Sequence, residues 1–391
     1  MNYILFDGPT RNSLLPFTFT KPVSEIRVGV MTIKEKWEKL LGCTLTYLTE
    51  EYLEAKYPMV EFDENVYIDA SVMPTKELAT EISFIAENQM LMRNDDMIAF
   101  FASKNQEEVD FESYEVIEFK EELFKIETKS DIFSHNYQAI NDDFQLLTKN
   151  RSSVDLSDTN TIIGPAENVF LEAGVAVECV VINATEGPVY IGEDAVVMEG
   201  SLLRGPIAIG EKAVVKMGAK IYSGTTIGPN CTVGGEIKNV VFFGNSNKGH
   251  DGYLGNSVVG EWCNFGADTN VSNMKNNHSE VSVWDYAEDG FMSSGLKFCG
   301  LFLGDYSKLG INTMINTGTV IGVSSNVFGS GFPDKFIPSF SWGGKESLVE
   351  YKIDKALNDA KKMRALKKKT FEDKDQKILE AIFEETKTYR P

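Results

Sequence analysis

The chain is poor in the residues that build metal centres, disulfide frameworks and membrane spans. It has five cysteines and three histidines among 391 residues. The cysteines are scattered, odd in number and form no Cys-x-x-Cys pair, which argues against a zinc site and favours reduced thiols in a cytoplasmic protein. No run of about 18 apolar residues occurs, so no membrane span is expected. The first residues also lack the basic and apolar regions of a signal peptide.

Basic residues are also scarce relative to acidic ones. The chain carries 38 Lys and Arg against 58 Asp and Glu, a formal net charge of −20. A nucleic-acid surface needs clustered cations to neutralise phosphates, so no nucleic-acid partner is expected. Small anionic ligands such as sugar phosphates would have to bind through local cations working against the overall field.

The chain does contain an aliphatic residue, often followed by glycine, at every sixth position from about residue 163 to 327. The repeat is clearest in two runs, Ile209, Val215, Ile221, Ile227, Val233 and Leu303, Leu309, Ile315, Ile321, Val327. A period of six fits neither an amphipathic helix nor an alternating strand. It predicts a parallel β-helix, in which each aliphatic side chain points inward and stacks on its copy in the next coil.

Three segments are predicted from the change of pattern along the chain. Residues 1–150 alternate strands with helices and predict an α/β domain, residues 155–330 form the β-helix, and residues 345–391 form a helical tail. The predicted strands of the first segment are Tyr3–Phe6, Thr44–Leu48, Val66–Ile68 and Met97–Phe101. Its predicted helices are Thr32–Leu40, Glu50–Ala55 and Phe133–Leu147.

The sixfold repeat is interrupted twice, between Lys238 and Val258 and between Asn273 and Gly300. Breaks in a regular scaffold are where loops and binding sites are placed. The first break contains His250 in a glycine-rich loop, and an imidazole near its unperturbed pKa is a natural general base at neutral pH. A histidine on a surface loop with no role is the alternative.

The first break and its continuation carry a long motif: Lys248-Gly249-His250, Tyr253-Leu254-Gly255, Asn264-Phe265-Gly266-Ala267-Asp268-Thr269 and Asn273. It resembles the KxGHxxYLG and IGxxxNIGAGT run of the bifunctional N-acetylglucosamine-1-phosphate uridyltransferase / glucosamine-1-phosphate acetyltransferase family, and the chain is most similar to its divergent Bacteroidetes form. The resemblance implies a left-handed β-helix that transfers acetyl from acetyl-CoA to glucosamine-1-phosphate or a related amino-sugar phosphate. It also implies a homotrimer.

The resemblance also implies roles for individual residues. His250 would be the general base and Glu236 the acid that orients it, while Asn273 would lie near the amine and the developing oxyanion. The implied substrate contacts are Lys238 and Tyr253 for the sugar phosphate and Asn264 for the sugar, and those for acetyl-CoA are Ala267 and Ser293.

Three positions depart from the family pattern. The family's arginine for the sugar phosphate has only Lys220 nearby, its later lysine falls at Ser279, with Lys275 and His278 as substitutes, and its second tyrosine is Met274. These changes affect the choice of amino sugar more than the type of reaction.

The opening of the chain carries a second motif, Asp7-Gly8-Pro9-Thr10-Arg11 followed by Lys21-Pro22. It resembles the nucleotidyltransferase signature LAxGxGTRxxPLTxxxPK, which implies nucleotide phosphates held by Gly8, Thr10, Arg11 and Lys21. An ordinary strand and turn is the alternative.

Nucleotidyl transfer needs an Asp that holds Mg²⁺ between phosphates. The corresponding segment places Ser71 at that position, and Asp69 would serve as the metal ligand only with a shifted register. The leading hypothesis is an acetyltransferase that uses acetyl-CoA, coupled to uridylyl transfer from UTP if the first segment is active with Mg²⁺. The alternatives are a sugar-1-phosphate nucleotidyltransferase using dTTP, with the β-helix as an oligomerisation scaffold, and a non-catalytic sugar-nucleotide sensor.

Overall fold

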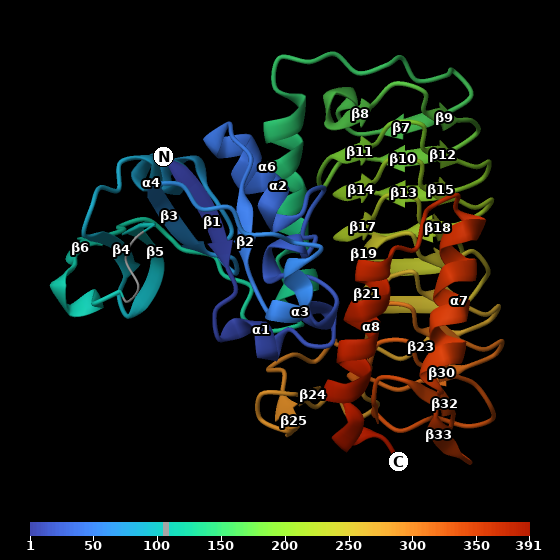
Figure 1. The fold of residues 1–391 in the computed structure, drawn as a ribbon. Helices are drawn as coiled ribbons and strands as arrows, with labels where there is room; N and C mark the ends of the chain where they lie inside the picture. Colours follow the sequence, from blue (N-terminus) through green and yellow to red (C-terminus); the bar gives the residue numbers. More distant parts are fainter. Residues whose placement is uncertain (105–108) are drawn as a thin grey trace. The chain divides into compact units, whose positions relative to one another are not determined.

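The computed structural model describes residues 1–104 and 109–391, which form two compact units (Figure 1). The first unit comprises Met1–Leu14, Thr20–Ile26 and Met31–Thr128, and the second comprises Leu15–Phe19, Arg27–Val30 and Lys129–Pro391. This division by contacts falls earlier than the boundary predicted near residue 150, because the segment after Thr128 packs with the second unit. The boundaries of the three predicted segments, 1–150, 155–330 and 345–391, are not those of the two units and stay a prediction.

The first unit is built on a mixed sheet of six strands in the order β2-β1-β3-β5-β4-β6. Strand β1 runs parallel to β2 and β3, β5 is antiparallel to β3 and β4, and β6 is a parallel edge strand beside β4. The strands are β1 Asn2–Phe6, β2 Thr46–Leu48, β3 Glu64–Asp69, β4 Gln89–Arg93, β5 Asp96–Ser103 and β6 Glu115–Glu118. Each of the four predicted strands is present.

The described part of the first unit has four α-helices, of which α2 begins and ends at clear local sequence signals. The helices are α1 Thr10–Ser13, α2 Ile33–Leu41, α3 Glu51–Glu54 and α4 Lys76–Ser83. Helix α2 starts with a capping box, in which Thr32 Oγ1 accepts from Glu35 N and Glu35 Oε2 accepts from Thr32 N. It ends at Gly42, which has φ +70°, a conformation that glycine adopts without strain.

The second unit is a parallel β-helix whose short strands stack along three faces (Figure 1). The first face holds β7 Thr161–Ile163, β10 Val181–Asn183, β13 Leu202–Arg204, β16 Lys220–Ile221 and the first parts of β19 Glu236–Gly244 and β21 Tyr253–Glu261. It continues with β23 Asn270–Val271 and β28 Met314–Ile315. The predicted architecture, an α/β domain followed by a parallel β-helix and C-terminal helices, is confirmed.

The other two faces are equally regular. The second face holds β8 Val169–Leu171, β11 Val189–Ile191, β14 Ile207–Ile209, β17 Thr225–Ile227, the later parts of β19 and β21, β26 Leu301–Leu303, β29 Thr319–Ile321 and β31 Phe336–Ile337. The third face holds β9 Ala176–Val177, β12 Val196–Val197, β15 Val214–Val215, β18 Thr232–Val233, β20 Asn247–Lys248, β22 Asn264–Phe265, β27 Lys308–Leu309, β30 Asn326–Val327, β32 Ser341–Gly343 and antiparallel β33 Leu348–Glu350.

The residues of the sixfold repeat form the core of the β-helix. Ile209, Val215 and Ile221 lie on three successive faces of one coil, and each is at most 1% exposed. Strand pairing in register places every inward side chain on its equivalent in the next coil. Outward side chains consequently form columns too, so residues far apart in sequence meet on one face.

Two helices and a hairpin pack outside the coils of the β-helix. Helices α5 Asp131–Ser134 and α6 Asn136–Thr148 pack on its coils, and the buried Asn136 amide donates to Gly224 O at 2.7 Å. The antiparallel hairpin of β24 Ser282–Asp285 and β25 Gly290–Ser293 fills the second break in the repeat.

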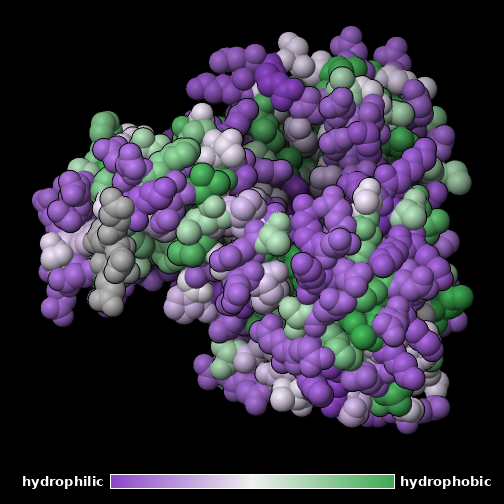
Figure 2. Space-filling model, in the orientation of Figure 1, coloured by the Kyte–Doolittle hydropathy of each residue, from purple (hydrophilic) through white to green (hydrophobic). Residues whose placement is uncertain are grey.

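The tail forms α7 Ile353–Leu366 and α8 Asp373–Glu385, and Arg364 of α7 donates to Tyr306 Oη at 3.0 Å. The tail therefore packs on the β-helix of its own chain. Its side of the molecule is mostly hydrophilic in the view of Figure 2. No helix in the described part of the chain is long and apolar enough to cross a membrane.

Adjacent leucines on β13 test the inward stacking. Leu203 points into the core and is 2% exposed, whereas its neighbour Leu202 is 48% exposed. We expect Leu203→Ala to lower the free energy of unfolding by about 2–5 kcal/mol and Leu202→Ala by less than about 0.5 kcal/mol. Thermal melting of both variants measures the difference, and equal losses would contradict the inward assignment of Leu203.

Candidate functional site

The first break in the repeat forms a corner between the third and first faces. Strand β20 ends at Lys248, and the chain turns through residues 249–252 into β21. Gly252 has φ +120°, and a Cβ there would collide with Thr269 O, so the turn requires glycine. His250 is exposed in this turn, and the turn is stacked on the next corner by a 3.1 Å hydrogen bond from Asp268 N to Asp251 O.

A buried cation holds this corner. Lys248 is 2% exposed, and its Nζ donates to Gly234 O at 3.1 Å and to the carbonyl of His250 at 2.8 Å. Burial lowers the pKa of Lys248 to about 8, an effect partly offset by the carboxylates of Asp251 and Asp268. The lysine thus fixes the backbone that carries His250. The sequence motif included Lys248 but gave no sign that its ammonium group points inward.

Three of the predicted residues meet on the first face just past this corner. Glu236 and Tyr253 are register partners on successive coils, and Asn273 Nδ2 donates to Tyr253 Oη at 3.0 Å. Burial raises the pKa of Tyr253, and the Glu236 carboxylate raises it further, while the hydrogen bond from Asn273 opposes both. Tyr253 therefore stays a neutral phenol whose own proton can be donated to a ligand.

Gly255 explains how Tyr253 reaches this position. A Cβ at Gly255 would collide with Tyr253 Oη and lie 2.8 Å from Asn273 Nδ2, so the hydroxyl lies over a residue without a side chain. The register partner of Gly255 on the previous coil is Lys238, which is exposed. The structure thus brings a phenol hydroxyl and an ammonium group to neighbouring positions of one face.

The remaining predicted residues of the β-helix lie apart from this cluster. Asn264 is on the third face, where its Oδ1 accepts from Asn247 Nδ2 at 3.0 Å. Ala267 lies at the next corner, and Ser293 on β25 donates to Glu280 Oε2 at 2.7 Å. Within residues 1–104 and 109–391 no hydrogen bond joins any of these three to Tyr253 or Asn273, or joins His250 to Glu236.

A cavity of about 260 Å³ opens beside Lys238. Its lining residues are Ser134, Tyr137, Ser223, Gly224, Lys238, Asn239, Asn256 and Phe298. Asn239 and Asn256 were not identified from the sequence. Both have positive φ, at +53° and +46°, so their sequence signal is that of ordinary corner residues.

In the first unit, the residues predicted to hold a nucleotide follow β1. Gly8 and α1 lie at its carboxyl end, beside Asp69 at the end of β3. Arg11 is buried, with Nη2 donating to Tyr52 Oη at 2.7 Å, and Lys21 is buried as well. Burial raises the pKa of Asp7 in the same turn to about 6, although hydrogen bonds from Thr49 and Val23 and the charge of Arg11 lower it. The two cations predicted to bind phosphate, Arg11 and Lys21, are therefore buried within the unit and do not lie on its surface.

The surroundings of Asp69 do not fit a magnesium ion. Asp69 Oδ1 accepts from the backbone and hydroxyl of Ser71 at 2.8 and 2.7 Å, and Oδ2 lies 3.2 Å from Lys125 Nζ. Mg²⁺ needs carboxylate oxygens free to enter its coordination shell. The described residues contain no group of three His, Cys, Asp or Glu side chains arranged to hold a metal. Lys125 supplies the positive charge at this carboxylate.

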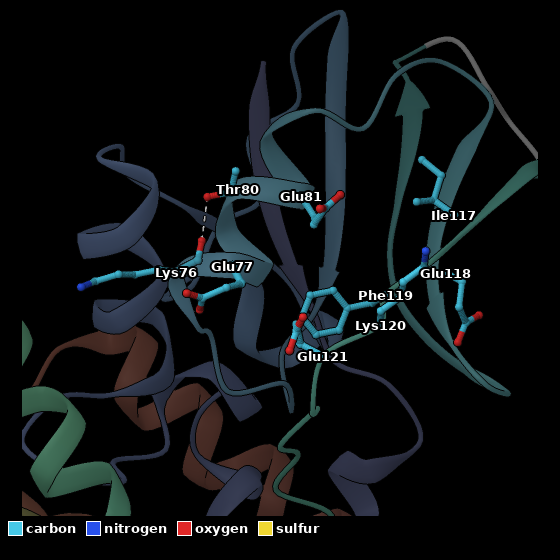
Figure 3. A pocket seen from close by; sticks show the side chains of 9 residues that line it. All are labelled: Lys76, Glu77, Thr80, Glu81, Ile117, Glu118, Phe119, Lys120 and Glu121. Atoms are coloured by element: carbon cyan, nitrogen blue, oxygen red, sulfur yellow. Dashed lines mark hydrogen bonds between the residues drawn. The ribbon is translucent and has the colours of Figure 1, made fainter.

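A cavity of about 730 Å³ in the first unit lies between α4 and the edge strand β6. Figure 3 shows α4 on one side and the segment from Ile117 to Glu121 on the other. Four glutamates and two lysines take part in its lining, and none of the predicted nucleotide-binding residues does.

Known proteins resemble this chain over parts of its length. Residues 3–152 match the family model described as sugar nucleotidyl transferase. An uncharacterized acetyltransferase of Escherichia coli, YaiX, is 32% identical over 172 residues, which cover 44% of this chain and 74% of the relative. A bifunctional GlmU protein of Methanococcus maripaludis is 38% identical over 173 residues, covering 44% of this chain and 40% of the relative.

A bifunctional sugar-1-phosphate nucleotidylyltransferase/acetyltransferase of Sulfurisphaera tokodaii is 34% identical over 93 residues, 24% of this chain and 23% of its own length. The chain thus spans less than half of the length of each of these two bifunctional relatives. Among solved structures, an Arabidopsis UDP-N-acetylglucosamine acyltransferase aligns with 61% of this chain and 99% of its own at 13% identity, with a TM-score of 0.28.

Titration of Lys248 tests the buried cation. Because its pKa falls from 10.5 to about 8 on folding, the unfolded chain binds more protons between these values. Lys248 therefore destabilises the fold below pH 8, and this effect is relieved as the pH rises to 10.5. We expect the melting temperature of the wild type, relative to that of Lys248→Met, to rise as the pH increases from 8 to 10.5. Parallel curves for the two proteins would contradict the depressed pKa.

Proposed function

The chain belongs to the GlmU-like family of transferases, and on that premise we propose that its β-helix transfers acetyl from acetyl-CoA to the amine of glucosamine-1-phosphate or a related amino-sugar phosphate. The observation that carries the proposal is the cluster beside the His250 corner. There Tyr253 is bonded to Asn273 and is the register partner of Glu236. This supports a site in which His250 serves as the base, Glu236 as its carboxylate and Tyr253 and Asn273 as polar groups for an anionic sugar.

The proposed reaction assigns each group a step. The amine nitrogen attacks the thioester carbonyl carbon, the C–S bond breaks, and coenzyme A leaves as a thiolate. His250 takes the proton that the nitrogen loses and returns it to the sulfur, so protons and electrons balance. Glu236 stabilises the imidazolium formed on the way. His250 is exposed and makes no side-chain hydrogen bond within the described residues, so it is accessible to a substrate.

The acceptor would lie along the first face. Lys238 and the hydroxyl of Tyr253, at neighbouring positions, offer an ammonium group and a phenol donor to its phosphate. We assign Asn264 to the sugar and Ala267 and Ser293 to acetyl-CoA, on the strength of the motif. The protein would act as a cytoplasmic homotrimer, in which a neighbouring β-helix completes the coenzyme site.

Substitution of His250 tests the proposed base. We expect His250→Asn to lower kcat for acetyl transfer by about 10²- to 10⁴-fold, because proton transfer by a positioned side chain contributes that much. Thiol release with acetyl-CoA and glucosamine-1-phosphate measures it. The control is Asn230→Gly, at a corner of the β-helix outside the motif, where the φ of +57° suits glycine. Similar activity in the two variants would exclude His250 as the base.

Nucleotidyl transfer by the first unit is a second candidate function. The observation that favours it is the match of residues 3–152 to a sugar nucleotidyltransferase family. The acetylated sugar phosphate would receive uridylyl from UTP, or another sugar phosphate would receive a nucleotidyl group from dTTP, with release of pyrophosphate. Gly8, Thr10, Arg11 and Lys21 would surround the nucleotide phosphates.

The ion pair between Lys125 and Asp69 makes the second candidate testable. Because the ammonium group engages the carboxylate that would bind Mg²⁺, we expect little pyrophosphate release by the wild type with UTP and N-acetylglucosamine-1-phosphate. Lys125→Met frees the carboxylate and should raise Mg²⁺-dependent release. Rapid release by the wild type would show that the pair is no obstacle. Binding of a sugar nucleotide without any release would favour the sensor alternative.

A further inference from the structure

A row of asparagine side chains leads from the proposed acceptor site across three coils of the β-helix. Asn273 Nδ2 donates to Asn256 Oδ1 at 2.8 Å. With the Asn239 amide assigned so that its nitrogen faces two backbone carbonyls, Asn256 Nδ2 donates to Asn239 Oδ1 at 3.0 Å. Asn239 Nδ2 donates in turn to the carbonyls of Phe133 and Gly224, at 2.9 and 3.2 Å, with its amide oriented by these partners. Every amide in the row points the same way.

The row uses both donors of Asn273. A side-chain amide has two N–H groups, and those of Asn273 go to Tyr253 Oη and Asn256 Oδ1. The amide therefore cannot also donate to an oxyanion. Its oxygen has no hydrogen-bond partner within residues 1–104 and 109–391, so Asn273 faces the site as an acceptor.

Head-to-tail amides polarise one another. An amide that donates through its nitrogen becomes a stronger acceptor at its oxygen, and a chain of such bonds adds to the effect. The Asn273 oxygen, at the end of three aligned amides, is the strongest acceptor of the row. It suits a nitrogen that becomes positively charged while it attacks a carbonyl carbon.

We propose that Asn256, supported by Asn239, is a positioning residue that turns the oxygen of Asn273 toward the attacking amine of the acceptor. This inference rests on the proposed acetyl transfer. The backbone supports it as well, because Asn273 O accepts from Cys299 N and Asn256 O accepts from Gly300 N, both at 2.8 Å. The chain that returns from the β24–β25 hairpin thereby fixes both residues from outside.

The backbone of Asn256 permits a clean test. Its φ of +46° lies in the left-handed region that glycine adopts without strain, so Asn256→Gly removes the side chain and keeps the corner. Asn230→Gly, at another corner with φ +57°, is the matched control outside the row. Asn256→Asp keeps an oxygen for Asn273 Nδ2 and serves as the conservative variant.

In the thiol-release assay with glucosamine-1-phosphate, we expect Asn256→Gly to lower kcat by about 10- to 100-fold with KM for the acceptor changed less than about threefold. Asn256→Asp should recover most of the rate, and Asn230→Gly should match the wild type. A kcat for Asn256→Gly within about twofold of wild type, or an equal fall in Asn230→Gly, would overturn the assignment.

Crystal structures separate this inference from the proposed function. If the wild type releases no thiol, the proposed acetyl transfer fails. The role of Asn256 in orienting the Asn273 amide is then tested by the crystal structures alone. We expect the Asn273 amide to keep its orientation in Asn230→Gly and to turn in Asn256→Gly. An unchanged amide in Asn256→Gly would show that Asn256 does not position it.

Discussion

The inward stacking of aliphatic side chains is the constraint on which the rest of this structure depends. Each coil places Ile, Val or Leu on its equivalent in the next coil, and a shift of one residue would expose the whole stack to water. Because this fixes the register of every strand, it also fixes which outward residues share a column. Glu236 and Tyr253 are 17 positions apart in sequence yet are register partners on one face.

A second level of order comes from polar groups at the corners. Lys248 holds the turn of His250 through two carbonyls, and the row from Asn239 to Asn273 holds the far side of the cluster. Lys248 is buried and the three asparagines are half-buried. Polar groups withdrawn from water are costly unless their partners are in place, so each set favours one local conformation. The candidate site thus combines a regular scaffold with two polar anchors, one on each side of Tyr253.

Sequence reasoning predicted the scaffold well because inward positions need only an aliphatic side chain of suitable size. Ile209, Val215 and Ile221 were all identified from the repeat, and all are buried. The meeting of Glu236, Tyr253 and Asn273 could be anticipated only from a family motif. The roles that we assign to these residues remain predictions.

Other features could not be predicted, for physical reasons. Asn239 and Asn256 resemble any corner residue, since a positive φ favours Asn whether or not its amide is used. A sequence also does not show whether a cation is exposed, so Arg11 and Lys21 could not be recognised as buried. The partner of Asp69 is Lys125, 56 positions away, and only the fold brings the two together.

The most direct test of the proposed acetyl transfer is thiol release by the wild-type protein with acetyl-CoA and glucosamine-1-phosphate, with the product identified by mass spectrometry. We predict one thiol released for each N-acetylated sugar phosphate formed. Thiol release no faster than the hydrolysis of acetyl-CoA alone, with no acetylated product, would contradict the proposal.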